Sequence, residues 1–311
     1  MPATRVDLGD GRWHFSHGPM DVILKVEGDQ AAVAAALAAA WARFEGLLAE
    51  LVAELVQLRQ PVIPSVPVQS TILKGVTARQ MYQACYFFCS DFITPMAAVA
   101  GAVAQDLIAR CQGPGITRAW ANNGGDIALH LTPGQSVRVG LFADLARLNT
   151  AATGQSIQLD GRFVISADMP VRGIATSGWR GRSLSMGIAD SVTVLAVNAA
   201  QADAAATLIA NAVNIAHPGI ERMPANQCKD DSDLGERWVT VQVPTLPADV
   251  VAEALTQGLA VAQKMQTAGL IFAAALVCQG QMQQTPILNL KTSPIRAEPE
   301  AIVGALPLVL A

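Results

Sequence analysis

The chain has 311 residues, of which 51% are hydrophobic and only 15% are charged, and its mean hydropathy is +0.34. A chain of this length and composition buries a large core, an oligomer interface, or both. The net charge is −4 and the sequence contains no basic run, which argues against nucleic acid or an acidic membrane as a partner.

The N-terminal residues, MPATRVDLGDGRW, contain neither the apolar core of a signal peptide nor a lipobox cysteine. The longest apolar run, 268–278, is shorter than a bilayer span. Five cysteines without regular spacing argue against a disulfide framework. These features predict a cytoplasmic protein.

The first third of the chain predicts strands followed by helices. Two strands are expected within 12–26, and a long helix over 31–55, where apolar residues recur every three or four positions. Proline residues punctuate 60–69, which predicts a loop. Residues 77–111 are expected to be mostly helical, with a new helix starting at Thr94-Pro95. The small residues of 97–104 allow either tight helix packing or the close approach of a ligand.

A glycine turn stands in the middle of the chain. Strands are predicted at 117–121 and 127–131, and between them Gly124 and Gly125 permit positive φ and expose consecutive N–H groups. Such a turn suits an anion, and it is equally an ordinary hairpin turn. Another strand is predicted at 137–142, followed by a hairpin over 155–166.

The segment 172–213 combines a small polar loop, a strand and a helix. The loop is Thr176-Ser177-Gly178, the strand is expected over 191–197, and an alanine-rich helix is expected to open at 201–203. Asp203 and Thr207 are four residues apart, so they share one helix face and offer two oxygens to a hard cation. Alternatively, Asp203 is a first-turn charge favoured by the helix dipole, and Thr207 is a small helix residue.

The remaining chain predicts a polar loop over 217–236, a strand over 238–243, a helix over 247–268 and a buried strand or helix end over 269–278. Residues 286–311 are broken by proline and apolar at their end, and we expect them to pack as a C-terminal arm on a partner subunit. Together with the high apolar content, this arm predicts a homo-oligomer, specifically a homodimer.

A strand–loop–alanine-helix plan recurs at 21–37 and 191–205, and more loosely at 238–255. The fold class predicted is therefore α+β, with mostly antiparallel sheets flanked by helices and internally similar strand–helix units. Residues 1–285 are expected to form a single compact body, with two intimately packed halves as the alternative arrangement.

Three segments, in order, resemble the ApbE-type flavin transferases. AVAGAVAQD at 98–106 is similar to the family's AIAKGYAVD, and NGGDI at 123–127 is similar to its NxGGDI turn. TSG, a strand of the SVTVLA type and AD-x-x-x-T follow within 176–207. The closer resemblance is to an uncharacterised branch of that superfamily, which carries TPMAAVAGAVA as found here at 94–104.

The resemblance implies an ApbE-like fold and metal-dependent chemistry on a flavin nucleotide. That chemistry is FMN transfer from FAD to a threonine of a target protein, or cleavage of the FAD pyrophosphate. A magnesium ion would be held by Asp203, Thr207 and the carbonyl of Ala100. The residues that the resemblance implies for binding the nucleotide or flavin are Thr176, Ser177, Gly178, Gly124, Gly125 and Asp126.

Two departures from the family pattern change what the resemblance implies. A family lysine is replaced by Gly101, and the HIIDPRTG-like segment is replaced by the shorter 179–190, WRGRSLSMGIAD. Arg180 and Arg182 either take over phosphate contacts or are surface charges.

Three hypotheses therefore stand. The first is an ApbE-like enzyme acting on a flavin nucleotide. The second is a cofactor-biosynthesis enzyme that uses the same pocket for another, pterin-like ligand. The third is a non-catalytic protein that binds a flavin or nucleotide.

Overall fold

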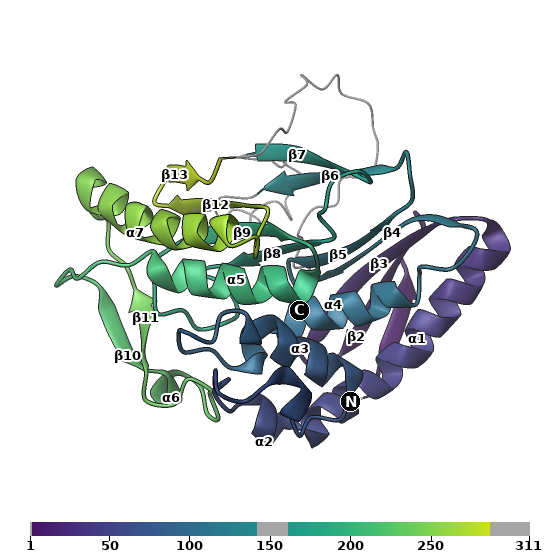
Figure 1. The fold of residues 1–311 in the computed structure, drawn as a ribbon, viewed down its shortest axis with the longest axis horizontal. Helices are drawn as coiled ribbons and strands as arrows, with labels where there is room; N and C mark the ends of the chain where they lie inside the picture. Colours follow the sequence, from purple (N-terminus) through teal and green to yellow (C-terminus); the bar gives the residue numbers. More distant parts are fainter. Residues whose placement is uncertain (1, 142–160, 287–311) are drawn as a thin grey trace.

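The computed structural model describes residues 2–141 and 161–286. A nine-stranded sheet, antiparallel at every pairing, runs through the molecule. Helices cover one face of this main sheet and a two-stranded sheet lies over the other (Figure 1). The α+β class and the antiparallel sheet flanked by helices agree with the sequence prediction.

The first half of the main sheet is built around a long strand–helix unit. Its strands are β1 (Thr4–Asp7), β2 (Arg12–His17), β3 (Met20–Gly28), β4 (Ile116–Asn123) and β5 (Asp126–Leu131). The helical segments between β3 and β4 are α1 (Gln30–Ala53), α2 (Leu55–Leu58), η1 (Val68–Ser70), α3 (Val76–Tyr86), η2 (Pro95–Ala98) and α4 (Val99–Ala109). Alternate residues of β3 are buried, so one face of the strand meets the helices.

The second half contains β8 (Gly173–Ser177), β9 (Ser191–Ala196), α5 (Ala199–Ala212), α7 (Ala248–Thr267), β12 (Ala273–Cys278) and β13 (Gln281–Gln284). A small lobe between α5 and α7 contains β10 (Glu221–Pro224), α6 (Ala225–Cys228) and β11 (Trp238–Gln242). The separate two-stranded sheet contains β6 (Ser136–Leu141) and β7 (Gly161–Ser166).

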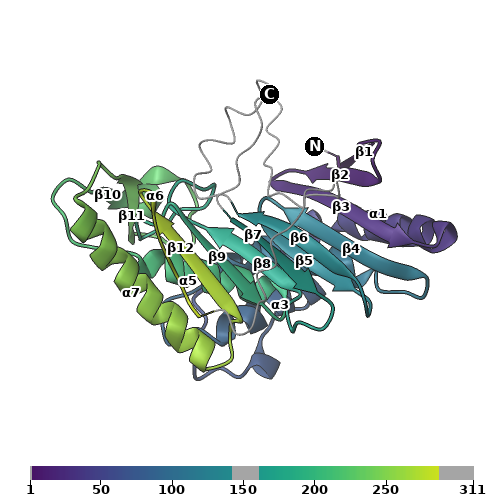
Figure 2. The same cartoon turned by 90° about the horizontal axis from the view of Figure 1, so that it is seen from above.

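The strand order shows that the two halves share one topology. The order in the main sheet is β1-β2-β3-β4-β5-β8-β9-β12-β13 (Figure 2). In each half a strand pair is followed by helices and then by a second strand pair, which returns beside the first. We call the boundary between β5 and β8 the seam. The predicted similarity of 21–37 and 191–205 corresponds to β3–α1 and β9–α5. The third, looser repeat, 238–255, also forms a strand and a helix, β11 and α7, but β11 pairs with β10 outside the main sheet.

Apolar side chains fill both faces of the main sheet. The helical face carries the larger core, which includes Phe15 of β2 and Phe44 of α1, with ring centroids 5.4 Å apart. The other face packs Trp120 and Leu129 against Val139 of β6. In the described part of the chain, α1 is the one helix with the length and composition of a membrane span, although the sequence prediction named only 268–278. Its buried stripe lies in the sheet-side core, although only 22% of its most apolar stretch is buried.

Several predicted boundaries change. Residues 161–166 form β7 and pair with β6, not within the hairpin predicted over 155–166; residues 155–160 are outside the described part. Residues 217–236 contain β10 and α6 in addition to loops. Within 269–278, the buried element is the strand β12. Of the predicted C-terminal arm, 287–311 lies outside the described residues.

Candidate functional site

Strand β4 leads into the glycine turn at the seam. Gly124 and Gly125 have φ of 66° and 115°, as the sequence predicts. The N–H of Gly125 donates to Asn122 Oδ1 at 2.8 Å. The turn is therefore closed by an asparagine side chain, and it does not present the two consecutive free N–H groups of an anion nest.

Helix α5 begins earlier than predicted. Asn198 is its N-cap, and Asn198 Oδ1 accepts from the Gln201 N–H at 2.9 Å. Asp203 consequently lies in the second turn, and the interpretation of Asp203 as a first-turn charge of its own helix is wrong.

Asp203 instead contacts the beginning of another helix. Its Oδ2 accepts from the Gly101 N–H of α4 at 2.9 Å, and the Ala100 N–H is a further backbone donor to the carboxylate. The N-cap of α4, Ala98, has no side-chain acceptor, so Asp203 caps this helix from its neighbour. Segments 93–127 and 172–213 therefore meet at Asp203, as the family resemblance implies for Ala100 and Asp203.

Gly101 marks a direct contact between the backbones of α4 and α5. A Cβ at this position would lie 2.3 Å from the Ala199 carbonyl oxygen. A lysine at 101 therefore has no room unless α5 moves. For 97–104, this contact supports the tight-packing alternative, and it gives a physical reason for the absence of the family lysine.

Two carboxylates share the seam in a poorly hydrated environment. Burial raises the pKa of Asp126 to about 7, although the Thr176 N–H donates to its Oδ1 at 3.1 Å and the charge of Arg182 acts in the opposite direction. Burial, and then the charge of Asp126, raise the pKa of Asp203 well above its usual range. Two carboxylates in such an environment favour a bound cation.

The donor set near Asp203 has the oxygen chemistry of a hard-cation site, but the Ala100 carbonyl and the Gly101 N–H belong to one trans peptide, so this carbonyl points away from the Asp203 oxygen that accepts from that N–H. The oxygens available are the Asp203 carboxylate, the Ala100 carbonyl and the hydroxyl of half-buried Thr207, one turn further along α5. The Ala100 carbonyl accepts from Asn123 Nδ2 at 3.1 Å, which leaves its second lone pair for another partner. Within 2–141 and 161–286, no three His, Cys, Asp or Glu residues are grouped to hold a metal ion. A cation here would have the sparse protein shell that magnesium accepts.

The predicted loop Thr176-Ser177-Gly178 is mostly strand, because Thr176 and Ser177 are the last residues of β8. Thr176 and Thr193 lie opposite each other, with their Oγ1 atoms 3.0 Å apart. They follow the alternation of Ile174 and Leu195, whose side chains pack on the β6–β7 side. The Thr176 hydroxyl therefore faces away from Asp203, and only its N–H reaches the site.

Gly178 is fixed by packing. A Cβ on Gly178 would lie 2.4 Å from the Asp190 carbonyl oxygen. Of the three predicted residues, Ser177 alone is directed toward the helical face by the alternation of β8.

The two predicted arginines occupy different environments. Arg180 Nε lies 3.2 Å from Asp190 Oδ1, and its guanidinium stacks over Trp179. Asp190 also accepts from the Gln279 N–H and from Trp179 Nε1, so Arg180, although exposed, is engaged by a buried carboxylate. Arg182 is exposed, and its Nη2 lies 2.0 Å from the point that a Cβ on Gly124 would occupy. The Arg182 guanidinium thus lies over the glycine turn beside Asp126.

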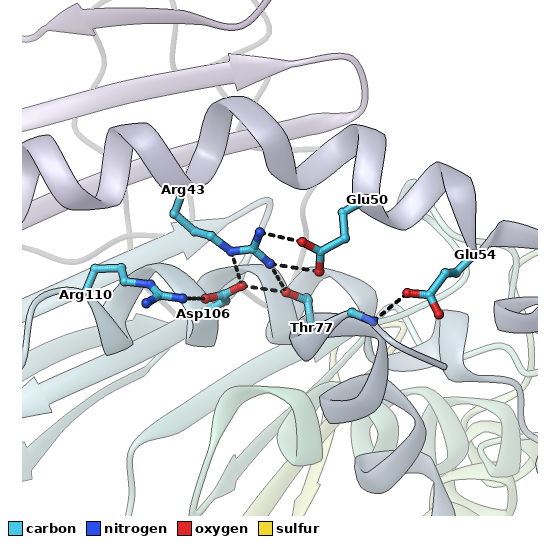
Figure 3. Close-up of polar contacts among 7 residues, drawn as sticks. Arg43, Glu50, Glu54, Thr77, Asp106 and Arg110 are labelled. Atoms are coloured by element: carbon cyan, nitrogen blue, oxygen red, sulfur yellow. Dashed lines mark hydrogen bonds and ion pairs between the residues drawn. The ribbon is translucent and has the colours of Figure 1, made fainter. Parts of the chain in front are cut away.

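Asp106, the last residue of the family-like segment 98–106, has a structural role. It accepts from Arg43 Nε at 2.7 Å and from Thr77 Oγ1 at 2.6 Å, and it pairs with Arg110 (Figure 3). Arg43 also forms a two-bond pair with Glu50. This network joins α1, α3 and α4, away from the glycine turn.

Two residues of the site escaped the sequence analysis as functional side chains. Asn123 orients the Ala100 carbonyl and also accepts from the Asp21 N–H. Cys85 donates to the Thr94 carbonyl at 3.2 Å, and burial followed by the charges of Asp203 and Asp233 raises its pKa. The paired asparagines before the glycines were the available signal for Asn123, whereas nothing local in the sequence indicates Cys85.

A family model described as AbpE bacteria matches residues 3–284. The chain is also similar to curated archaeal proteins named only UPF0280 protein, a name that states no activity. The one from Methanothermobacter thermautotrophicus is 40% identical over 123 residues, 39% of this chain and 43% of that protein. The one from Methanopyrus kandleri is 36% identical over 152 residues, 48% of this chain and 56% of that protein.

The chain thus spans about half the length of the curated relatives it matches. Among solved structures, the ApbE protein of Thermotoga maritima aligns over 91% of this chain and 97% of that chain, with a TM-score of 0.45 and 11% identity.

Proposed function

This chain belongs to the AbpE bacteria family, an ApbE-like branch, and we propose that it is a magnesium-dependent enzyme acting on a flavin nucleotide, by FMN transfer or by cleavage of the FAD pyrophosphate. The observation that carries the proposal is a pair of carboxylates at the seam, buried Asp126 and half-buried Asp203, of which Asp203 contacts the N-terminus of α4. An uncompensated pair of this kind is a candidate functional site because its charges disfavour each other until a cation binds.

In this proposal, different residues at the seam bind the cation and orient its ligands. Asp203, the Ala100 carbonyl and Thr207 would hold the cation, and Asn123 keeps the carbonyl oriented. Magnesium bound there would neutralise charge that develops on phosphate oxygens. The hydrogen bond from the Gly101 N–H fixes the orientation of the Asp203 carboxylate. Its second oxygen therefore also has a fixed direction.

Arg182 is the arginine that we assign to the nucleotide phosphate. It lies beside the turn at Gly124 and is exposed, whereas Arg180 is engaged with Asp190. A guanidinium recognises phosphate through two parallel hydrogen bonds. Arg182 would therefore supply the positive charge that the family lysine provides. A lysine has no room at position 101 in this chain.

Calorimetric titration of magnesium, with and without FAD, tests the proposal together with detection of AMP or FMN. Asp203→Asn keeps an acceptor for the cap of α4 but removes the charge, so we expect magnesium affinity to fall more than about tenfold while the fold survives. Thr207→Val should also weaken magnesium binding. Thr193→Val is the matched control, because it removes a hydroxyl on the opposite face of the sheet.

The outcomes separate the hypotheses. Unchanged magnesium binding in both Asp203→Asn and Thr207→Val would contradict the metal site and the transferase proposal with it. Magnesium binding without FAD binding would favour a different, pterin-like ligand. Binding of FAD or FMN without product would identify a non-catalytic flavin protein.

We further propose that the protein acts in the cytoplasm as a homodimer. All five cysteines are free thiols, as expected in a reducing compartment. Light scattering tests the assembly, and a monomer at micromolar concentration would contradict it.

A further inference from the structure

Arg222, in the small lobe, is a half-buried cation without an anionic partner in the described part of the chain. Its Nη2 donates to Asn214 Oδ1 at 2.5 Å and to the Ile215 carbonyl at 3.4 Å, and both acceptors are neutral. Burial lowers its pKa, and no carboxylate acts against this effect. The donors on Nε and Nη1 therefore remain available.

Thr240 lies directly opposite Arg222 in the β10–β11 pairing. Cross-strand partners point to the same side, with Cβ atoms about 4.5–5.5 Å apart. Thr240 is only 4% exposed, and its hydroxyl has no hydrogen-bond partner among residues 2–141 and 161–286. Leaving a buried hydroxyl unpaired is unfavourable, so the site lacks an acceptor for Thr240 as well as an anion for Arg222.

We propose that Arg222 and Thr240 form a binding site for a small oxyanion, a phosphate or carboxylate group. Among the described residues, the hydrogen bonds of the guanidinium are made by Nη2, so in this proposal the anion lies between Nε and the Thr240 hydroxyl. An oxyanion there would accept the unused arginine donors and the hydroxyl, and it would compensate the half-buried charge. The site is separate from Asp203, and it stands independently of the proposed function.

The stretch 182–186 borders both sites. Arg182 lies over Gly124, and the Ser185 carbonyl accepts from the Thr240 N–H at 2.8 Å. The oxyanion is consequently either a free anion or the phosphate of a ligand that also reaches the seam. A free anion and a ligand phosphate present the same oxyanion to Arg222, and the experiment distinguishes the two sources.

The test is titration of the full chain with sodium phosphate, followed by calorimetry and by the melting temperature at constant ionic strength. Wild type should bind saturably. Arg222→Met should weaken phosphate binding at least about tenfold, because a charge-assisted pair is lost. Asn214→Asp should do the same while preserving the fold, because it places a carboxylate against Arg222.

Thr240→Val is expected to change the stability of the phosphate-free protein in opposite directions for a binding role and for a structural role. It should weaken phosphate binding several-fold and leave the phosphate-free protein equally or more stable, because an unpaired hydroxyl is removed. If Thr240 has only a structural role, the same change lowers stability and leaves phosphate binding intact, which overturns the proposal. If Arg222→Met fails to fold, Asn214→Asp and Thr240→Val still decide.

Two controls define the location of the anion. Arg237→Met removes another arginine near the small lobe, one that stacks on Phe92, and should leave phosphate affinity unchanged, as should Asp203→Asn. Equal weakening by Arg237→Met, or no saturable binding by wild type, would overturn the proposal. Competition between AMP and phosphate that is lost in Arg222→Met would assign the oxyanion to a ligand phosphate, and its absence would assign it to a free anion.

Discussion

The two halves of the main sheet have the same topology but are held together by different forces. In the first half, only five of the 24 residues of α1 are buried, and charged side chains link α1 to α3 and α4 (Figure 3). In the second half, ten of the 14 residues of α5 are buried, mostly alanines packed among β8, β9, α3, α4 and α7. The candidate site lies where these two arrangements meet. Small residues allow the backbones of α4 and α5 to approach closely. Because of this close packing, Asp126 and Asp203 are poorly hydrated.

The largest expected effect concerns the charged network of the first half. Asp106→Ala leaves Arg43 without one of its two carboxylates and should lower the free energy of unfolding by about 3–5 kcal/mol. Urea unfolding measures this loss. Arg110→Ala removes a partner whose side chain is 43% exposed and should cost less than about 1 kcal/mol. Equal losses in the two variants would contradict the central role of Asp106.

The second effect is a pH dependence that originates at the seam. Because the pKa of Asp126 is raised from 3.8 to about 7, the folded state keeps a proton that the unfolded state has released over this interval. Stability without metal should therefore fall as pH rises from about 4 to 7, by about 2–4 kcal/mol.

Urea midpoints at several pH values, in EDTA and in magnesium, measure this slope. Asp126→Asn should flatten it, and magnesium should reduce it. Asp249→Asn, in the first turn of α7, is the control and should leave the slope unchanged. A stability that rises with pH over the same interval, with no change in Asp126→Asn, would refute the assignment.

The third effect compares one glycine from each half. Gly101→Ala pushes a methyl group against the Ala199 carbonyl and should cost about 1–3 kcal/mol while weakening magnesium binding. Gly46→Ala, in α1, meets nothing within 4 Å and should stabilise the protein by about 0.5–1 kcal/mol. Thermal unfolding of both variants measures the contrast, and a neutral Gly101→Ala would show that α5 can yield.

The smallest effect compares two caps supplied by neighbouring helices. Glu54 accepts from the N–H groups of Lys74 and Gly75, the two residues before α3, whereas Asp203 accepts from an N–H inside the first turn of α4. Glu54→Ala and Asp203→Ala should each cost about 0.5–2 kcal/mol. Only Asp203→Ala should abolish the stabilisation by magnesium, and a loss of that response in both variants would make capping the sole role of Asp203.

Much of the fold follows from local sequence patterns. The alternation of 20–28 gives β3, the three-and-four spacing gives α1 and α7, and the glycine pair gives the turn after β4. The meeting of Ala100 and Asp203 was expected only from the family resemblance, because more than a hundred positions separate them. Pattern reasoning cannot bring such distant residues together without a known fold.

The remaining features depend on contacts that no local pattern encodes. The start of α5 was misplaced because the Asn198 cap was overlooked in favour of the alanine run. The orientation of Thr176 depends on whether it lies in a loop or in β8, and one residue of register reverses the face of a strand. The role of Gly101 is set by Ala199, a residue of another helix.

The burial of α5 has a consequence for amide hydrogen exchange. A helix that packs against a sheet and three other helices, with only a narrow half-buried stripe, has little opportunity to open locally, so its amide protons should exchange mainly when the whole molecule unfolds. The amides of α1, which has a broad exposed face, should exchange through smaller openings. Asp203 and Thr207 are therefore attached to one of the slowest-exchanging parts of the chain, and any motion that admits a ligand must come from the glycine turn and the 179–190 connection.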